Sequence, residues 1–419
     1  MRPYLGVVAC VGSMALAAIS PTANSQALFK PITSSQVPAK PDALGSQAID
    51  AGDYVYISGQ SPHRADGSTP SSYSDQVKQC LDNIEALVKA AGLTKENIVY
   101  VQAYMDDTTK YSDLNQAFAA YFPKDPPARG ILGVAANPDS SIQITAMAVR
   151  DLTGKKSVTP PNYKPSKAFS WGMLTHDRLF ISNMPGIDPV TGKIPSDPAA
   201  QVNLALDGLK AVNEAAGLTL ANMVFVNPYL TDEIPHNVMN KAYAARFEFG
   251  NTPGRATIEA SSLPEGAHIA YTGISVRDIS QRRSIKPKNM PPSPTASPCV
   301  FAGDTLYCSA KSGFIPGTNL GMFIQDVPNQ TRQSMRNQLD NLEEADMKYD
   351  TVVSTVIYLD NLSETSDFAN VYKKFFGKVL PATTVVQQMK PVDRKPDSEG
   401  HVPEVEQFSL VAIRSHAKQ

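Results

Sequence analysis

Hydrophobic and polar positions follow one pattern that changes midway through each of three blocks of the chain. In the block at 75–107, Val77, Leu81 and Ile84 recur at helical spacing and define one apolar face. β-branched and aromatic residues then take over in "IVYVQAYM" at 98–105, which is typical of a buried strand. The pattern therefore predicts a helix followed by a strand.

The same block occurs two more times, at 200–232 and, more weakly, at 329–361, without gaps. A hairpin pattern precedes each block, and a short helix, a proline segment and a last strand follow it. The hairpins lie at 48–60, 172–184 and 300–310, the short helices at 113–122, 236–247 and 367–376, and the last strands at 142–150, 269–277 and 407–414. Each repeat is expected to be a ββαβαβ unit of the α+β class, with both helices on one face of the sheet. Glycines at 92 and 217 stand where the first helices should end.

A sheet covered by helices on one face leaves an apolar second face that must be buried. Three such sheets can bury these faces against each other, with sheets inside, helices outside and clefts between neighbouring repeats. The expected segments are a signal peptide (1–25), an N-terminal linker (26–38), repeat 1 (39–152), a linker (153–165), repeat 2 (166–279), a Pro/Lys-rich linker (280–294) and a degenerate repeat 3 (295–419).

The composition excludes a disordered or fibrous protein and gives no sign of nucleic-acid binding. The 419 residues are 42% hydrophobic and 19% charged, as in ordinary globular proteins, and the net charge of −2 gives no field that would attract nucleic acid. The N-terminus has an early arginine, an apolar run at 5–19 and then small residues, which is the layout of a secretory signal. We therefore expect a periplasmic or secreted protein that has no membrane anchor once the signal is removed.

Two cysteines flank a predicted two-residue turn. A turn at Gly303 and Asp304 places Cys299 directly opposite Cys308. Export permits a disulfide between them, and two buried thiols are the alternative. Cys80 is expected to be a core residue of a helix.

Three motifs, in order, resemble the reactive intermediate deaminase (Rid/YjgF) family: "YISGQ" at 56–60, "LDNIEALVKAAGL" at 81–93 and "PPARG" at 126–130. The resemblance implies a chorismate mutase-like fold, homotrimers and a site in each subunit interface. A chain of three repeats is then similar to a covalent trimer, which could act as a monomer. The resemblance also implies hydrolysis of small enamines and imines, such as 2-aminoacrylate and 2-iminopropionate, to a 2-keto acid and ammonia. It implies no cofactor and no metal.

The resemblance assigns the substrate's carboxylate to Arg129 and Arg255, because a guanidinium offers two parallel donors to it. It assigns Asn115 and Asn240 to the same cleft, although either could instead cap a helix. The backbone of Ser58 and Gly59 matches the opposite wall of the family's site.

Several positions depart from the family pattern. Where the family's deaminases carry a water-positioning glutamate, this chain has Gln143, Ala270 and Gln407, and a glutamine cannot accept the proton. Repeat 3 has Thr383 in place of the arginine and Ala369 in place of the asparagine. At most two clefts should therefore bind acids, and at most one of these two should use the intact wall at 58–60. Gln143 is kept as a candidate catalytic residue.

Two functions remain after this comparison. The first is an imine deaminase-like hydrolase that acts on a small carboxylate-bearing imine or enamine, and the alternative is a non-catalytic small-molecule binder or scaffold. RNA cleavage, reported for some family members, does not suit the acidic charge balance. The six histidines show no metal-ligand spacing. Phe169 and Trp171 could line a cleft or pack in the core.

Overall fold

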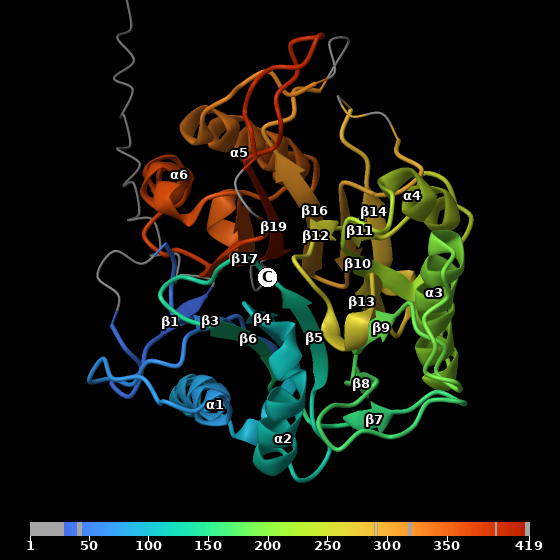
Figure 1. The fold of residues 1–419 in the computed structure, drawn as a ribbon. Helices are drawn as coiled ribbons and strands as arrows, with labels where there is room; N and C mark the ends of the chain where they lie inside the picture. The colour runs from blue at the N-terminus through green and yellow to red at the C-terminus, as the bar shows by residue number, and fades with distance from the viewer. Residues whose placement is uncertain are drawn as a thin grey trace, which may run out of the picture.

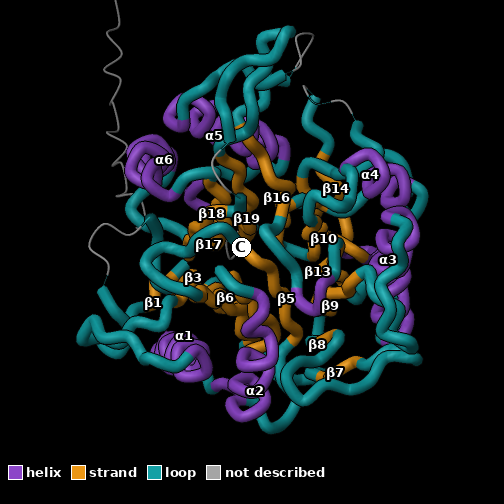
Figure 2. Tube along the Cα trace, viewed as in Figure 1, coloured by secondary structure: helices purple, strands orange, loops and turns teal. Residues whose placement is uncertain are grey.

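The computed structural model describes residues 29–39, 44–288, 290, 292–316, 321–389 and 392–414. Three mixed sheets face a common centre and the long helices lie on the outside (Figure 1). The tube coloured by secondary structure shows the same arrangement, with strands inside and helices at the periphery (Figure 2). The predicted α+β class and pseudo-trimer are therefore confirmed. The predicted signal peptide at 1–25 lies outside the described residues.

The elements of the three repeats correspond one to one, apart from an interrupted edge strand in repeat 2. Repeat 1 contains β1 (Lys30–Ile32), β2 (Ala48–Asp50), β3 (Tyr54–Gln60), α1 (Tyr73–Ala90), β4 (Ile98–Met105), α2 (Tyr111–Tyr121), β5 (Ala128–Gly133) and β6 (Ile142–Val149). Repeat 2 contains β7 (Lys156–Val158), β8 (Gly172–Leu174), β9 (Arg178–Pro185), α3 (Pro198–Ala215), β10 (Met223–Leu230), α4 (His236–Ala244), β11 (Gly254–Arg255), β12 (Ile258–Glu259) and β13 (Ile269–Val276). Repeat 3 contains β14 (Arg282–Ile285), β15 (Cys299–Ala302), β16 (Thr305–Ser312), α5 (Val327–Glu344), β17 (Val352–Leu359), α6 (Thr365–Tyr372), β18 (Ala382–Gln387) and β19 (Glu406–Ile413). Short 3₁₀ turns lie at Lys95–Asn97, Thr108–Lys110, Leu220–Asn222, Pro264–Gly266, Ile279–Gln281, Tyr349–Thr351, Leu362–Glu364 and Lys373–Phe375.

Each sheet has strands beyond the predicted ββαβαβ set, at both of its edges. The proline segment that carries the arginine is a strand of its own, which runs parallel to β4, β10 or β17. At the other edge, β1, β7 and β14 pair antiparallel with β2, β8 and β15. These three strands lie in segments that the sequence analysis placed in linkers (26–38, 153–165 and 280–294), so that assignment is corrected. Short edge strands rich in Lys and Arg are hard to distinguish from connecting segments.

Four hydrophobic cores hold the molecule together. The central core draws buried residues from all three repeats, including Tyr104, Tyr229 and Tyr358. Each of the other three cores lies between the helices and the sheet of one repeat. Because the central core is shared, no repeat buries the inner face of its sheet alone.

The first helix of each repeat ends at a residue with left-handed backbone. Gly92 and Gly217 both have φ of 76°, which confirms their predicted role as helix stops. Asp346 takes this conformation in repeat 3 with φ of 56°. The αL conformation costs energy for a residue with a Cβ, so repeat 3 departs from the repeat pattern here too.

Cys299 and Cys308 lie opposite each other on β15 and β16 and form a disulfide. The register is the predicted one, and the alternative of two thiols does not hold. Cys80 is buried in α1.

The disulfide closes a short loop, so we expect the Cys299→Ser/Cys308→Ser variant to lose only about 2–3 kcal/mol of unfolding free energy. Urea unfolding of the variant beside the oxidised wild type measures this loss. Intact mass with and without reductant checks the bond, and an unchanged mass after reduction of the unfolded protein would contradict it.

Repeat 3 differs from the others in the layer between its first helix and its sheet. Where repeats 1 and 2 have apolar or small residues, α5 buries polar side chains: Thr331, Ser334, Gln338 and Asn341. Gln338 donates to the carbonyls of Ser309 and Phe408 at 2.9 and 3.2 Å. On the facing strand Glu406 is 1% exposed and neither carboxyl oxygen has a hydrogen-bond partner among the described residues. The matching residues of repeats 1 and 2 are Ile142 and Ile269.

Burial raises the pKa of Glu406 well above its usual value. The folded state then binds the proton more tightly than the unfolded state, so stability is lost as pH rises above the unfolded pKa of about 4.3. We expect Glu406→Ile to raise the unfolding free energy at neutral pH by about 2 kcal/mol and to flatten its pH dependence. Urea unfolding between about pH 5 and about pH 8 measures both effects. A variant that is less stable than wild type across this range would contradict the assignment.

Within the described residues, no helix is both long and apolar enough to cross a membrane.

Candidate functional site

A cleft lies at each junction between repeats. Cleft 1/2 joins repeats 1 and 2 and has a volume of about 340 Å³, cleft 2/3 about 590 Å³ and cleft 3/1 about 710 Å³. These volumes are in the range of small-molecule sites. In each cleft one repeat supplies the edge strand with its arginine or threonine, and the next supplies the wall around Ser58, Ser182 or Ser309.

Cleft 1/2 holds Arg129, the second residue of β5. The side chain is 2% exposed, and its Nη2 donates to the Asn115 Oδ1 of α2 at 2.5 Å. Its Cζ lies 4.6 Å from the ring centre of Phe118 and 5.0 Å from that of Phe169, which belongs to repeat 2. Nε and Nη1 have no hydrogen-bond partner among the described residues. Two donors of a buried cation are therefore left for an anion.

Arg129 is packed more deeply than a residue that merely lines a cleft, and burial lowers its pKa. A guanidinium nevertheless stays protonated in proteins, so the side chain remains a cation. An unpaired buried charge is costly and such positions concentrate at functional sites.

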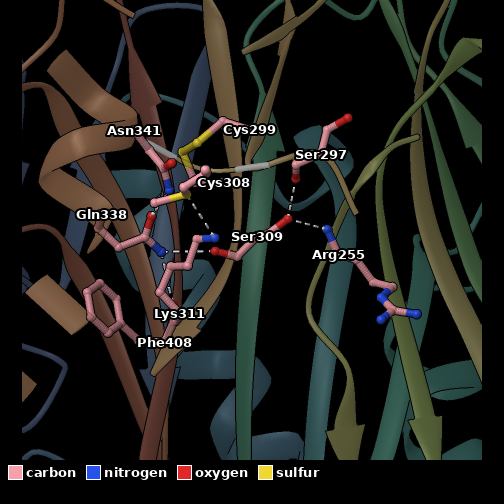
Figure 3. The surroundings of a disulfide bond; sticks show 10 residues. Arg255, Ser297, Cys299, Cys308, Ser309, Lys311, Gln338, Asn341 and Phe408 are labelled. Atoms are coloured by element: carbon pink, nitrogen blue, oxygen red, sulfur yellow. Dashed lines mark hydrogen bonds between the residues drawn. A yellow bond between two sulfur atoms is a disulfide. The ribbon is translucent and has the colours of Figure 1, made fainter. Parts of the chain in front are cut away.

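Serines of the wall hold the arginine strands in place. The Ser182 hydroxyl accepts from the Arg129 N–H at 2.7 Å and donates to the Ser170 carbonyl at 2.6 Å. Figure 3 shows the same arrangement in cleft 2/3, where the Ser309 hydroxyl lies between the Ser297 carbonyl and the Arg255 N–H at 2.6 and 2.8 Å. These hydroxyls therefore connect neighbouring repeats.

Cleft 2/3 repeats the arginine–asparagine pair. Arg255 Nη1 donates to Asn240 Oδ1 at 2.8 Å, and Nη2 donates to the Thr295 hydroxyl at 3.2 Å. Burial lowers the pKa of Arg255. The structure thus brings each arginine together with its predicted asparagine, Arg129 with Asn115 and Arg255 with Asn240.

The predicted wall lies in a different cleft from both arginines. Ser58, Gly59 and Gln143 line cleft 3/1, opposite Thr383 of repeat 3. A Cβ on Gly59 would stand 1.9 Å from Gln143 Oε1, so only glycine fits beside this glutamine. Neither arginine shares a cleft with the 58–60 wall, which is within the predicted limit of at most one such cleft, and Gln143 lies in a different cleft from Arg129 and Arg255. The reason is the order of the repeats: each arginine faces the next repeat, and the wall of repeat 1 faces repeat 3.

Thr383 makes hydrogen bonds inside its own repeat. Its hydroxyl lies 3.0 Å from that of Thr355 and 3.2 Å from that of Tyr372. At this position cleft 3/1 offers no cation to a carboxylate.

Sequence reasoning missed two titratable residues of cleft 2/3. Lys311 follows the Ser309 wall, and Glu404 precedes β19; both line this cleft with Arg255. In cleft 1/2, Phe169 and Trp171 line the cavity in addition to packing against the cores. Comparing Gln60, Met184 and Lys311 along the repeats would have singled out the lysine as an exception.

No group of three or more His, Cys, Asp or Glu residues suited to a metal ion occurs in the part of the chain that the structure describes.

Comparison with known proteins identifies the family of this chain. The family model described as Endoribonuclease L-PSP matches three times, at 38–150, 160–274 and 289–392. The chain is 36% identical to the 2-iminobutanoate/2-iminopropanoate deaminase of Escherichia coli strain K12, over 26% of this chain and 91% of that protein. It is 34% identical to a RutC family protein of Pyrococcus horikoshii, over 27% of this chain and 91% of that protein.

Among solved structures, the YjgF gene product of E. coli aligns with a TM-score of 0.28 and 34% identity, over 29% of this chain and 99% of that one. Each of these alignments has the length of a single repeat. The chain belongs to the Endoribonuclease L-PSP (Rid/YjgF) family and contains three copies of its domain.

Proposed function

We propose that the protein is an imine or enamine hydrolase that converts small 2-imino acids to 2-keto acids and ammonia in clefts 1/2 and 2/3. The observation that carries this proposal is Arg129, a buried cation with two free donors beside Asn115. A substrate carboxylate that accepts from one of these donors is held in the cleft, which places the imine carbon next to it. The related deaminase of E. coli supports the same reaction class.

The two clefts differ in the residue that occupies the position of the family's glutamate. Cleft 1/2 has Ala270 at the position of the family's glutamate, and Glu265 is the carboxylate among its lining residues. Cleft 2/3 has Gln407, whose Nε2 donates to the Thr257 carbonyl at 3.2 Å and to Gln388 Oε1 at 3.0 Å. Because this amide is engaged and cannot take a proton, any acid–base group of cleft 2/3 must come from elsewhere in the cavity.

A non-catalytic binder is the second candidate, and Ala270 is the observation that favours it. A methyl group beside Arg129 can neither position water nor move a proton. RNA, although it appears in the family's description, is less suited to two separate clefts that each hold one deeply set arginine.

Ammonia release from freshly generated 2-iminopropionate distinguishes the two candidates. The purified protein is expected to release ammonia faster than the spontaneous background, in proportion to protein concentration. Background-level release from folded protein that still binds pyruvate would establish the binder instead.

A further inference from the structure

Cleft 2/3 contains a lysine whose surroundings differ from those of an ordinary surface lysine. The described residues form no ion pair with Lys311, and its Nζ contacts the Met290 sulfur at 3.7 Å, a weak acceptor. Lys311 lines the same cavity as Arg255, on the strand that also presents Ser309. Repeats 1 and 2 have Gln60 and Met184 at this position, so the amine is particular to one cleft.

The surroundings increase the fraction of this amine that is in the neutral, nucleophilic form near neutral pH. Burial lowers the pKa of Lys311 to about 8, because removal from water disfavours the ammonium. A desolvated lysine near neutrality is the form that attacks carbonyl and imine carbons.

Glu404 supplies a proton donor and acceptor in the same cavity. Burial raises the pKa of Glu404 to about 7, so both protonation states are present near neutral pH. Its neighbours include Glu259 and His236, which pair with each other at 3.1 Å and also line the cavity. A group that titrates near the working pH is suited to proton transfer in both directions.

We propose that Lys311 is a covalent catalytic residue of cleft 2/3, a role that rests on the proposed function and deepens it. Arg255 holds the carboxylate of a 2-imino acid, and the neutral Lys311 amine attacks the imine carbon. The C–N bond to the original nitrogen breaks, and ammonia leaves with a proton from Glu404. The acid stays bound as a Schiff base on Lys311. Water then adds to the Schiff-base carbon, and the 2-keto acid leaves as the lysine amine is restored.

This route explains how cleft 2/3 could hydrolyse an imine although Gln407 occupies the position of the family's glutamate. Gln407 cannot activate water against a free imine, but a protonated Schiff base is a stronger electrophile than the neutral imine and needs less activation. The reaction requires no oxidant, reductant or added cofactor, since every atom comes from the imine, water and the lysine.

Borohydride trapping with pyruvate tests the proposal, because pyruvate forms the same Schiff base from the product side. Peptide mass mapping is expected to find one carboxyethyl group on Lys311 and none on Lys164, the exposed lysine that lines cleft 1/2. Lys311→Met, which copies Met184 of repeat 2, is expected to abolish the adduct while its thermal midpoint shows a folded protein. Arg255→Met should raise the pyruvate concentration needed for labelling by about tenfold or more.

Two results would overturn the proposal: no adduct on Lys311 in folded protein, or equal labelling of Lys164 and other exposed lysines. Ammonia release separates this failure from failure of the proposed function. In an Arg129→Met background, which leaves cleft 2/3 as the acid site, Lys311→Met is expected to lose most of the release. Undiminished ammonia release would mean that water attacks the imine directly. The protein would then still be a hydrolase, but without a covalent intermediate on Lys311. An adduct without any ammonia release in this background would mean that cleft 2/3 does not hydrolyse the imine and that Lys311 does not displace ammonia.

Discussion

Replacing Arg129 and Arg255 together by methionine is expected to lower kcat/KM for 2-iminopropionate by about a hundredfold, or about 3 kcal/mol of transition-state binding. In the proposed function each arginine binds the substrate carboxylate in its cleft, and its asparagine partner fixes the direction of the guanidinium. Methionine keeps much of the side-chain volume, so the aromatic packing around Arg129 is preserved. Initial rates of ammonia release measure the effect.

Thr383 gives the matched control for this experiment. It occupies the position of the arginine in cleft 3/1 and makes its bonds to Thr355 and Tyr372. Thr383→Val is expected to leave ammonia release unchanged. Equal losses in Thr383→Val and in the double arginine variant would mean that the arginines act through stability alone. Full activity in the double variant would remove them from the site.

Arg178→Met is expected to destabilise the protein by about 3–5 kcal/mol, the largest effect of a single substitution outside the clefts. Arg178 is buried where the three repeats meet. It pairs with Asp177 at 3.2 Å and donates to the Tyr307 and Thr305 hydroxyls of repeat 3 at 2.7 and 2.6 Å. Tyr54 of repeat 1 donates to Asp177 at 2.5 Å, so the substitution breaks a network that spans all repeats.

Urea unfolding measures this loss, and Arg150→Met is the matched control. Arg150 pairs with Asp50 at 2.8 Å but its side chain is 42% exposed, so its removal should cost less than about 1 kcal/mol. Similar losses in the two variants would contradict the role of the Arg178 network in joining the repeats.

Much of the fold could be predicted because each repeat carries its own local signals. The strands at 98–105 and 223–230 have the predicted bounds, since a run of β-branched and aromatic residues begins and ends there. Gly92 and Gly217 stop their helices, and the turn at Gly303 sets the disulfide register. These features depend on residues that are close in sequence.

The clefts could not be predicted as completely, because they depend on which repeat faces which. The sequence identifies Ser58, Gly59 and Gln143 as the best-preserved wall, but it does not show that Thr383 stands opposite them. The burial of Lys311 in cleft 2/3 could not be predicted either, because the residues next to it in the sequence do not distinguish it from an exposed lysine. The edge strands β1, β7 and β14 were missed because their composition is that of a linker. Export to the periplasm or beyond stays a prediction, since it rests on residues 1–25.

The number of carboxylate sites per chain tests the central claim most directly. Calorimetric titration with 2-oxobutanoate is expected to show two sites in the wild type, one site of that affinity in Arg129→Met, one in Arg255→Met and none of that affinity in the double variant. Three sites, or a site of undiminished affinity in the folded double variant, would contradict the assignment of acid binding to clefts 1/2 and 2/3.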